Sequence, residues 1–222
     1  MTVASRRAAF RATFCACLAL ATLAAGCAGE AGRDFGSGWR ALFAQVPPGS
    51  DADLRIFYPS GAAVEGVAAL SRMQLDATLI LWLARDQAGA MADLVQAFQR
   101  LHPDNTVAVV TLAPELLRDA ILSGGLSYEF DNYPGLPDLY ASTQLADLQA
   151  LKRAGFVREY AIYLRDPRRQ QTYSIAALVR SRRDEAARLW LEFLRSAEAH
   201  AEYARHGYAA PAAAEAAPQP IP

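Results

Sequence analysis

Polar side chains follow three apolar runs of the sequence, each at the point where a strand would end and a helix begin. These side chains belong to Arg85, Asp86, Glu115, Ser142 and Thr143. A guanidinium, carboxylates and hydroxyls can together hold a small ligand or an ion through charge and hydrogen bonds. Open sheets of parallel strands bind their ligands beyond the carboxyl ends of the strands. We therefore expect these five residues to form a ligand-binding rim, called the strand-end rim below.

The acidic residues of this region could instead supply oxygen ligands to a cation. The candidates are Asp86, Glu115, Glu129, Asp131 and Asp138. Their spacing does not match a calcium-binding loop. Acidic side chains are also favoured near helix N-termini, where they interact with the helix dipole, and this gives Asp86 and Glu115 a structural explanation. The sequence therefore leaves the metal unknown and predicts no cofactor.

The sequence lacks the motifs of several common enzyme classes. It has no G-x-S-x-G nucleophile elbow, no phosphate-binding glycine loop and no H-E-x-x-H zinc motif. The chain carries 22 basic and 23 acidic side chains, for a net charge of −1, and no basic patch that would attract nucleic acid. We therefore expect a binding or interaction protein, not an enzyme, and no nucleic-acid partner.

The elements that must position the strand-end rim alternate between strands and helices. Residues 78–83 form a nearly continuous apolar run, typical of a strand buried on both faces. Apolar side chains then recur at helical spacing over residues 88–101. Further strands are expected near residues 54–58, 107–111, 138–142, 157–164 and 173–179, with helices starting at Pro114, Leu145 and Asp184. This order predicts an α/β fold, a three-layer sandwich with a mostly parallel sheet.

The first 27 residues have the features of a bacterial lipoprotein signal peptide. Arg6, Arg7 and Arg11 precede an apolar core that is too short to span a bilayer. That core ends in LAAGC, which resembles a lipobox, so Cys27 would carry the lipid. An ordinary secretory signal, with Cys27 incidental, is the alternative. All three cysteines lie in this segment, which excludes a disulfide framework from the mature chain.

The expected organisation has four segments. A signal peptide (1–27) precedes a flexible tether (28–52), a single α/β lobe (53–208) and a disordered tail rich in Ala and Pro (209–222). The lipid would hold the protein on the periplasmic face of the bacterial membrane. Ala28, in place of an aspartate after the cysteine, favours the outer membrane.

An aromatic and polar loop is the strongest candidate for contact with a partner protein. It contains Tyr128, Phe130 and Tyr133. Aromatic side chains flanked by polar groups are typical of interface anchors. The same loop could instead cover an exposed edge of the sheet.

Several stretches resemble the periplasmic molybdate-type (type 2) substrate-binding proteins of ABC transporters. LWLARDQAGAMADLVQAF, at residues 81–98, resembles the opening of that family, and PDLYAST with LADLQALKRAGFV resembles its third strand and the helix after it. The end of the chain, from YSIAALV to Gly207-Tyr208, resembles the closing strand and paired helices. The resemblance covers residues 77–157 and 173–208. It implies one lobe of a two-lobed receptor, with an ABC permease as partner.

Two departures from the family change what the resemblance implies. Only residues 158–172 lie where the family has a whole second lobe, which is too short for a domain. Family members hold a dianion with serines at the first two strand ends, and these positions match Asp86, Ala113 and Pro114 here. A carboxylate would repel an anion by about 4 kcal/mol for unit charges at contact near a surface. Only Ser142 keeps the pattern, so molybdate binding in the family's manner is not expected.

Two functions are compatible with these features. The first is a membrane-anchored, solute-binding-like lipoprotein that binds a small ligand or ion at the strand-end rim for an ABC-type uptake system. The second is a non-transport accessory or assembly protein with a degenerate ligand site, which docks a periplasmic or membrane partner protein.

Overall fold

The computed structural model describes residues 43–47, 50, 52–128, 131–179, 181 and 183–222. The expected signal peptide, the lipidation residue Cys27, most of the expected tether, and Phe130 lie outside the described residues.

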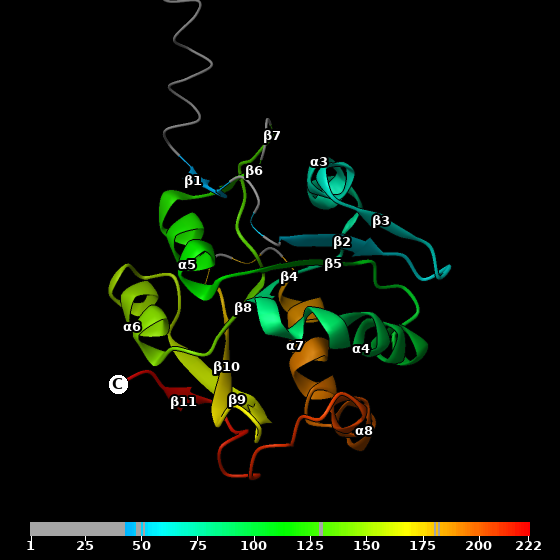
Figure 1. The fold of residues 1–222 in the computed structure, drawn as a ribbon, viewed down its shortest axis with the longest axis vertical. Coiled ribbons are helices and arrows are strands. Elements are labelled where there is room, and N and C mark those ends of the chain that lie inside the picture. Colours follow the sequence, from blue (N-terminus) through cyan, green and yellow to red (C-terminus); the bar gives the residue numbers. More distant parts are fainter. Residues whose placement is uncertain (1–42, 48–49, 51, 129–130, 180, 182) are drawn as a thin grey trace, which may run out of the picture. The chain divides into compact units, whose positions relative to one another are not determined.

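A mixed sheet of eight strands forms the centre of the fold, in the order β11-β9-β10-β8-β4-β5-β2-β3 (Figure 1). The central strand β4 (Leu79–Ala84) pairs in parallel with β5 (Val107–Leu112) and with β8 (Leu139–Ser142). The antiparallel strands on either side are β2 (Asp53–Phe57), β3 (Ala63–Glu65), β9 (Glu159–Asp166), β10 (Gln171–Ala177) and β11 (Gln219–Pro220).

The predicted α/β sandwich is confirmed, and within the eight-stranded sheet parallel pairing is confined to the three central strands. Helical crossovers follow β4 and β5, whereas a short turn over residues 167–170 joins β9 to β10. A turn of that length can connect only antiparallel neighbours, because a parallel partner needs a crossover of a dozen or more residues. The sheet is therefore mixed, and the expectation of a mostly parallel sheet is corrected.

Helices cover both faces of this sheet. The side chains of Leu79, Leu81 and Leu83 lie in one apolar cluster, and those of Ile80 and Trp82 lie in another. The first cluster contains residues of α4 (Ala88–Leu101), α7 (Asp184–Phe193) and α8 (Ala197–Arg205). The second contains residues of α3 (Val67–Asp76), α5 (Pro114–Ser123) and α6 (Leu145–Arg153). The apolar run of β4 is continuous because its side chains pack into the core on both faces of the sheet.

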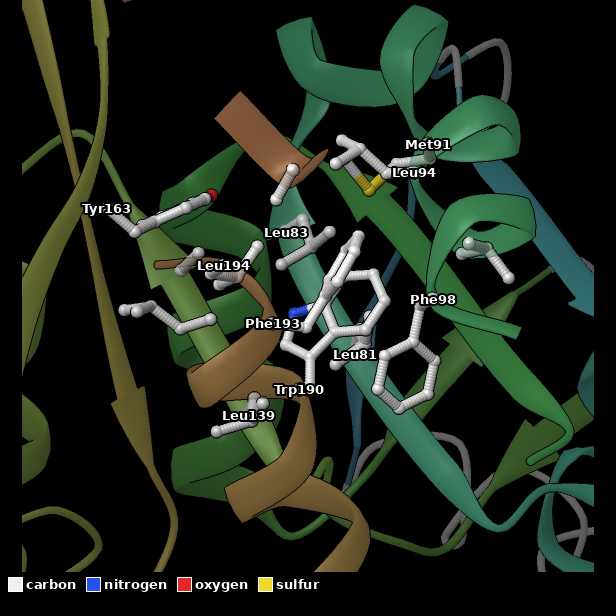
Figure 2. Packing of buried hydrophobic residues seen from close by; sticks show 14 of the residues in the cluster. Leu81, Leu83, Met91, Leu94, Phe98, Leu139, Tyr163, Trp190, Phe193 and Leu194 are labelled. Atoms are coloured by element: carbon white, nitrogen blue, oxygen red, sulfur yellow. The ribbon is translucent and has the colours of Figure 1, made fainter. Parts of the chain in front are cut away.

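Aromatic rings fill the first of these clusters. Figure 2 shows Trp190 and Phe193 of α7 between the side chains of β4 and Phe98 of α4. The centroid of the Phe98 ring lies 5.0 Å from that of Trp190 and 5.5 Å from that of Phe193, and both pairs are arranged edge to face. Edge-to-face pairs add to the stabilisation that burial of the rings provides. This packing holds α4 and α7 against the sheet that carries the strand-end rim.

A second, smaller sheet contains β1 (Ala44–Gln45), β6 (Leu126–Tyr128) and β7 (Asp131–Tyr133). β1 runs parallel to β6, and the adjacent Val46 is 7% exposed. The last part of the expected tether is therefore packed into the fold. No helix among the described residues has the length and apolar character needed to span a membrane.

The C-terminal segment is ordered, which corrects the expectation of a disordered tail over residues 209–222. β11 pairs antiparallel with β9, and the Ile221 side chain is 1% exposed within the second apolar cluster. Lys152 donates to the Ile221 carbonyl, and Arg165 pairs with Glu215. The edge strand β9 would otherwise present unpaired backbone groups. Composition alone suggested disorder, but this edge provides a partner.

Candidate functional site

The carboxyl ends of three adjacent strands meet at one edge of the sheet, as the sequence predicts. Ala84 is in register with Leu112, and Leu81 with Leu139, so β4, β5 and β8 end side by side. A short 3-10 helix, η2 (Arg85–Gln87), follows β4 and leads into α4. The five residues of the strand-end rim therefore belong to three neighbouring strand ends.

Asp86 is the centre of a polar cluster at the end of β4. Its Oδ2 lies 3.0 Å from Arg169 Nη1 and also accepts a hydrogen bond from the Tyr173 hydroxyl. The Tyr208 hydroxyl donates to the Asp86 main-chain carbonyl at 2.7 Å. Asp86 is 21% exposed at its side chain, and Arg169 is 59% exposed. The carboxylate thus faces the guanidinium of Arg169, which remains open to solvent.

The turn between β9 and β10 presents Arg169 to Asp86. Asp166, at the end of β9, accepts hydrogen bonds from the backbone N–H groups of Arg168 at 2.9 Å and Arg169 at 3.1 Å. Gln170 follows with a φ of 54°, which reverses the chain into β10. In the sequence, this segment joins the strands expected near residues 157–164 and 173–179. Nothing local identifies its partner, because Arg169 is separated from Asp86 by 83 positions.

The charges of this cluster are fixed by their surroundings. The Asp86 carboxylate raises the pKa of Arg169 by direct charge attraction. Burial, together with the hydrogen bond to Asp86, raises the pKa of Tyr173 well above the ordinary phenol value. Arg169 therefore stays cationic and Tyr173 stays a neutral hydrogen-bond donor at physiological pH. The Asp86 carboxylate is therefore paired with a cation, and a group that replaces Arg169 there must itself carry positive charge.

A cluster of four tyrosines supports η2 from below the rim. Tyr163 lies 6.5 Å from Tyr173 and 6.2 Å from Tyr203, and Tyr208 lies 6.0 Å from both Tyr173 and Tyr203, measured between ring centroids. The Tyr163 hydroxyl donates to Oε1 of Gln87, whose side chain is fully buried. These contacts fix the backbone that carries Asp86.

Ser142 is placed at the end of β8 as expected, but its side chain faces the protein interior. It is fully buried, and its hydroxyl donates to Asp147 Oδ2 at 2.7 Å while accepting from the Gln144 N–H at 3.0 Å. The other Asp147 oxygen accepts from Arg118 Nη1 at 2.9 Å. Ser142 therefore anchors the start of α6, and its assignment as a ligand-binding residue is corrected.

The remaining residues of the rim differ in accessibility. Arg85 and Glu115 are exposed, and Thr143 is half-buried. Glu115 occupies the first turn of α5, where an acidic side chain is favoured by the helix dipole. Among the described residues, no group of three or more His, Cys, Asp or Glu side chains could hold a metal ion.

The expected partner-contact loop packs largely against the protein itself. Tyr133 is 2% exposed, and its ring lies 6.2 Å from that of Trp82 in the second apolar cluster. Tyr128 is half-buried and packs against the same cluster. Tyr133 is therefore a core residue, and its assignment as a partner contact is corrected. Both tyrosines therefore pack against the second apolar cluster.

Comparisons with known proteins give little beyond the fold itself. No protein-family model and no curated protein matches the sequence. Among solved structures, the substrate-binding domain of a molybdenum ABC transporter from Clostridium difficile matches with 12% identity and a TM-score of 0.46. The match covers 60% of this chain and 98% of that domain. Similarity this low transfers neither ligand nor partner, so the interpretation of the site rests on its geometry.

Proposed function

We propose that this protein is a lipid-anchored, single-lobe solute-binding protein on the periplasmic face of the bacterial membrane, which binds a small cationic solute at Asp86. It would deliver that solute to the permease of an ABC-type uptake system. The observation that carries the proposal is the pair between Asp86 and the exposed guanidinium of Arg169.

Arg169 occupies the position that the cationic group of a solute would take. Its side chain is 59% exposed and reaches Asp86 from a four-residue turn, residues 167–170. Exposed ion pairs contribute little to stability because water screens them. A solute amine can therefore displace Arg169 at small cost and pair with the Asp86 carboxylate in its place.

The same cluster disfavours an oxyanion. A dianion placed at the end of β4 would meet the Asp86 carboxylate, and the Ser142 hydroxyl is already used by Asp147. Small amines or guanidines are the solute class that fits.

Calorimetric titration of the purified full-length protein in detergent tests this proposal. The probes are putrescine, agmatine and arginine, with molybdate and sulfate as anions. We expect saturable binding of at least one cation, loss of binding in Asp86→Asn, and unchanged binding in Arg188→Ala. Arg188 is a matched control because its guanidinium pairs with Glu185 and Glu192 on α7. Binding of molybdate, or of a cation equally well by Asp86→Asn, would overturn the proposal.

An accessory role is the second candidate, favoured by the closed network at the end of β8. Ser142, Asp147 and Arg118 satisfy one another there, which is compatible with a degenerate ligand site. This role predicts no binding of any probe by the wild type or by Arg169→Ala, together with co-purification of a periplasmic partner.

The lipid anchor is tested separately. We expect radiolabelled palmitate to label the full-length protein in a bacterial host and Cys27→Ala to remain unlabelled. Labelling of Cys27→Ala would exclude Cys27 as the lipidated residue.

A further inference from the structure

A polar cavity lies at the opposite end of the central strands from the strand-end rim. Its volume is about 280 Å³, which is at the small end of ligand pockets, roughly 300–1,000 Å³. It is called the amino-edge cavity because Asp138 immediately precedes β8 and bonds to the second residue of β4. Its lining residues are Gln74, Leu136, Pro137, Asp138, Ser181 and Arg183, with Pro134 and Gly135.

Asp138 is held rigidly in this cavity. Its Oδ2 accepts from the Ile80 N–H at 2.8 Å, and its Oδ1 accepts from the Ser181 hydroxyl at 2.8 Å. The residue is only 1% exposed. Buried carboxylates are retained only where such partners compensate for lost hydration. The cavity therefore has a preorganised acceptor in its wall.

Arg183 is fixed opposite this carboxylate. Its Nε donates to the Ala77 carbonyl at 3.0 Å and its Nη2 to the Gln74 carbonyl at 3.3 Å, and Nη1 lies 3.9 Å from Asp138 Oδ1. A guanidinium has five N–H donors, so donors remain for a ligand. The charges of Asp138 and Arg183 offset each other. A ligand with its own net charge would disturb this balance.

Gln74 completes the polar wall. An ideal Cβ on Gly135 would lie 1.9 Å from Gln74 Nε2 and 3.0 Å from Tyr133 Cζ, so both side chains crowd the glycine of the cavity wall. Tyr133 itself does not line the cavity. The polar groups open to a ligand are therefore those of Gln74, Asp138, Ser181 and Arg183.

We infer that the amino-edge cavity binds a small, neutral, hydroxyl-rich molecule such as a monosaccharide or polyol. Hydroxyl groups both donate and accept hydrogen bonds, which matches the donors of Arg183, the carboxylate of Asp138 and the two-sided amide of Gln74. The apolar walls at Leu136 and Pro137 suit the C–H groups of such a molecule. This inference is independent of the proposed function, because the two sites lie at opposite ends of β4.

Amide NMR spectra of the full-length protein in detergent, titrated with glucose, arabinose, xylitol and glycerol, test the inference. We expect saturable shifts at residues 74–80 and 134–139 with at least one of these probes and none with succinate or putrescine at these positions. Gln74→Leu keeps the side-chain volume but loses the amide, so affinity should fall about tenfold. Gly135→Ala should also weaken binding, because its Cβ would lie 1.9 Å from Gln74 Nε2 and would displace the amide.

Two controls keep the outcome decisive. Gln144→Leu makes the same chemical change at an exposed position on another edge and should bind like the wild type. Asp86→Asn should also leave this binding unchanged, whatever the fate of cation binding at the rim. Absence of saturable shifts with all four probes would overturn the inference. So would unchanged affinity in folded Gln74→Leu and Gly135→Ala, or shifts confined to residues 84–87.

Discussion

Each end of the central strands has a carboxylate beside a guanidinium, but the two pairs differ in their exposure to water. At the carboxyl ends, Asp86 pairs with an arginine that is 59% exposed and projects from a turn. At the amino ends, Asp138 is 1% exposed and faces an arginine that two backbone carbonyls hold in place. Water screens the first pair, whereas in the second pair the Asp138 carboxylate is almost completely removed from water. The first end is therefore suited to exchange of partners, and the second to a fixed wall.

Replacement of Asp138 should produce the largest effect on stability. Asp138→Ala removes the acceptor of the Ile80 N–H and the Ser181 hydroxyl and leaves Arg183 without its counter-charge. Loss of one partner of a buried charged pair costs about 3–5 kcal/mol. Urea denaturation followed by circular dichroism measures the change in the free energy of unfolding.

The control for this variant is Asp104→Ala, which changes an exposed aspartate in a turn. Its free energy of unfolding should stay within about 0.5 kcal/mol of the wild type. Equal stabilities of the two variants would contradict the contrast between the two ends of the strands.

Removal of the Ser142 hydroxyl should have the next largest effect on the free energy of unfolding. It tests whether the protein itself occupies the polar groups at the end of β8. Ser142→Ala leaves a buried Asp147 oxygen and the Gln144 N–H without their partner. An unsatisfied buried group costs about 1–3 kcal/mol. The neighbouring Thr143→Ala, at a half-buried residue, should change the free energy of unfolding by less than about 0.5 kcal/mol. A larger loss of stability in Thr143→Ala than in Ser142→Ala would show that Ser142 does not anchor the start of α6.

The sequence predicted the local elements of both ends better than the contacts between them. The helix expected over residues 88–101 is observed as Ala88–Leu101, and the next helix starts at Pro114 as expected. Apolar periodicity and proline at the first helical position encode these features locally. The partners of Asp86 do not have a local signal, because Arg169 and Tyr173 follow it by 83 and 87 positions.

The error at the strand-end rim has a physical cause, competition within the protein for the Ser142 hydroxyl. Ser142 was assigned to a ligand because strand ends commonly bind ligands, whereas Asp147, five positions later, takes its hydroxyl. A carboxylate in the first turn of the helix that follows the strand could have indicated this competition. The sequence also did not predict the direction of β10 or the packing of residues 209–222. Both depend on which edge of the sheet is free, and the apolar periodicity of a sequence contains no information about free edges.

The pH dependence of stability should report Asp138 in particular. Burial raises the pKa of Asp138, and this exceeds the lowering by Ser181, the Ile80 N–H and Arg183. Its pKa is therefore higher in the folded than in the unfolded protein, so its stabilising contribution is complete below the unfolded pKa. That contribution is lost as the pH rises through the folded pKa.

Asp138→Asn provides the comparison, because an amide does not titrate. Urea denaturation at a series of pH values should show the wild type losing stability relative to Asp138→Asn as the pH rises from about 3 to neutrality. The free energies of unfolding of the two proteins could instead differ by a constant amount, or the wild type could gain stability relative to Asp138→Asn as the pH rises. Either result would contradict the conclusion that burial sets the direction of the Asp138 pKa shift.

Replacement of Arg169 should have the smallest effect on stability and a clear effect on binding. The pair is screened at the surface, so Arg169→Ala should leave the melting temperature close to that of the wild type. If Arg169 competes with the solute for Asp86, its removal raises the fraction of binding-competent protein. The affinity for the cationic probe should then increase on the order of three- to tenfold. A large drop in melting temperature without a gain in affinity would mean that Arg169 is a structural clamp, and the two ends of the strands would then not differ in kind.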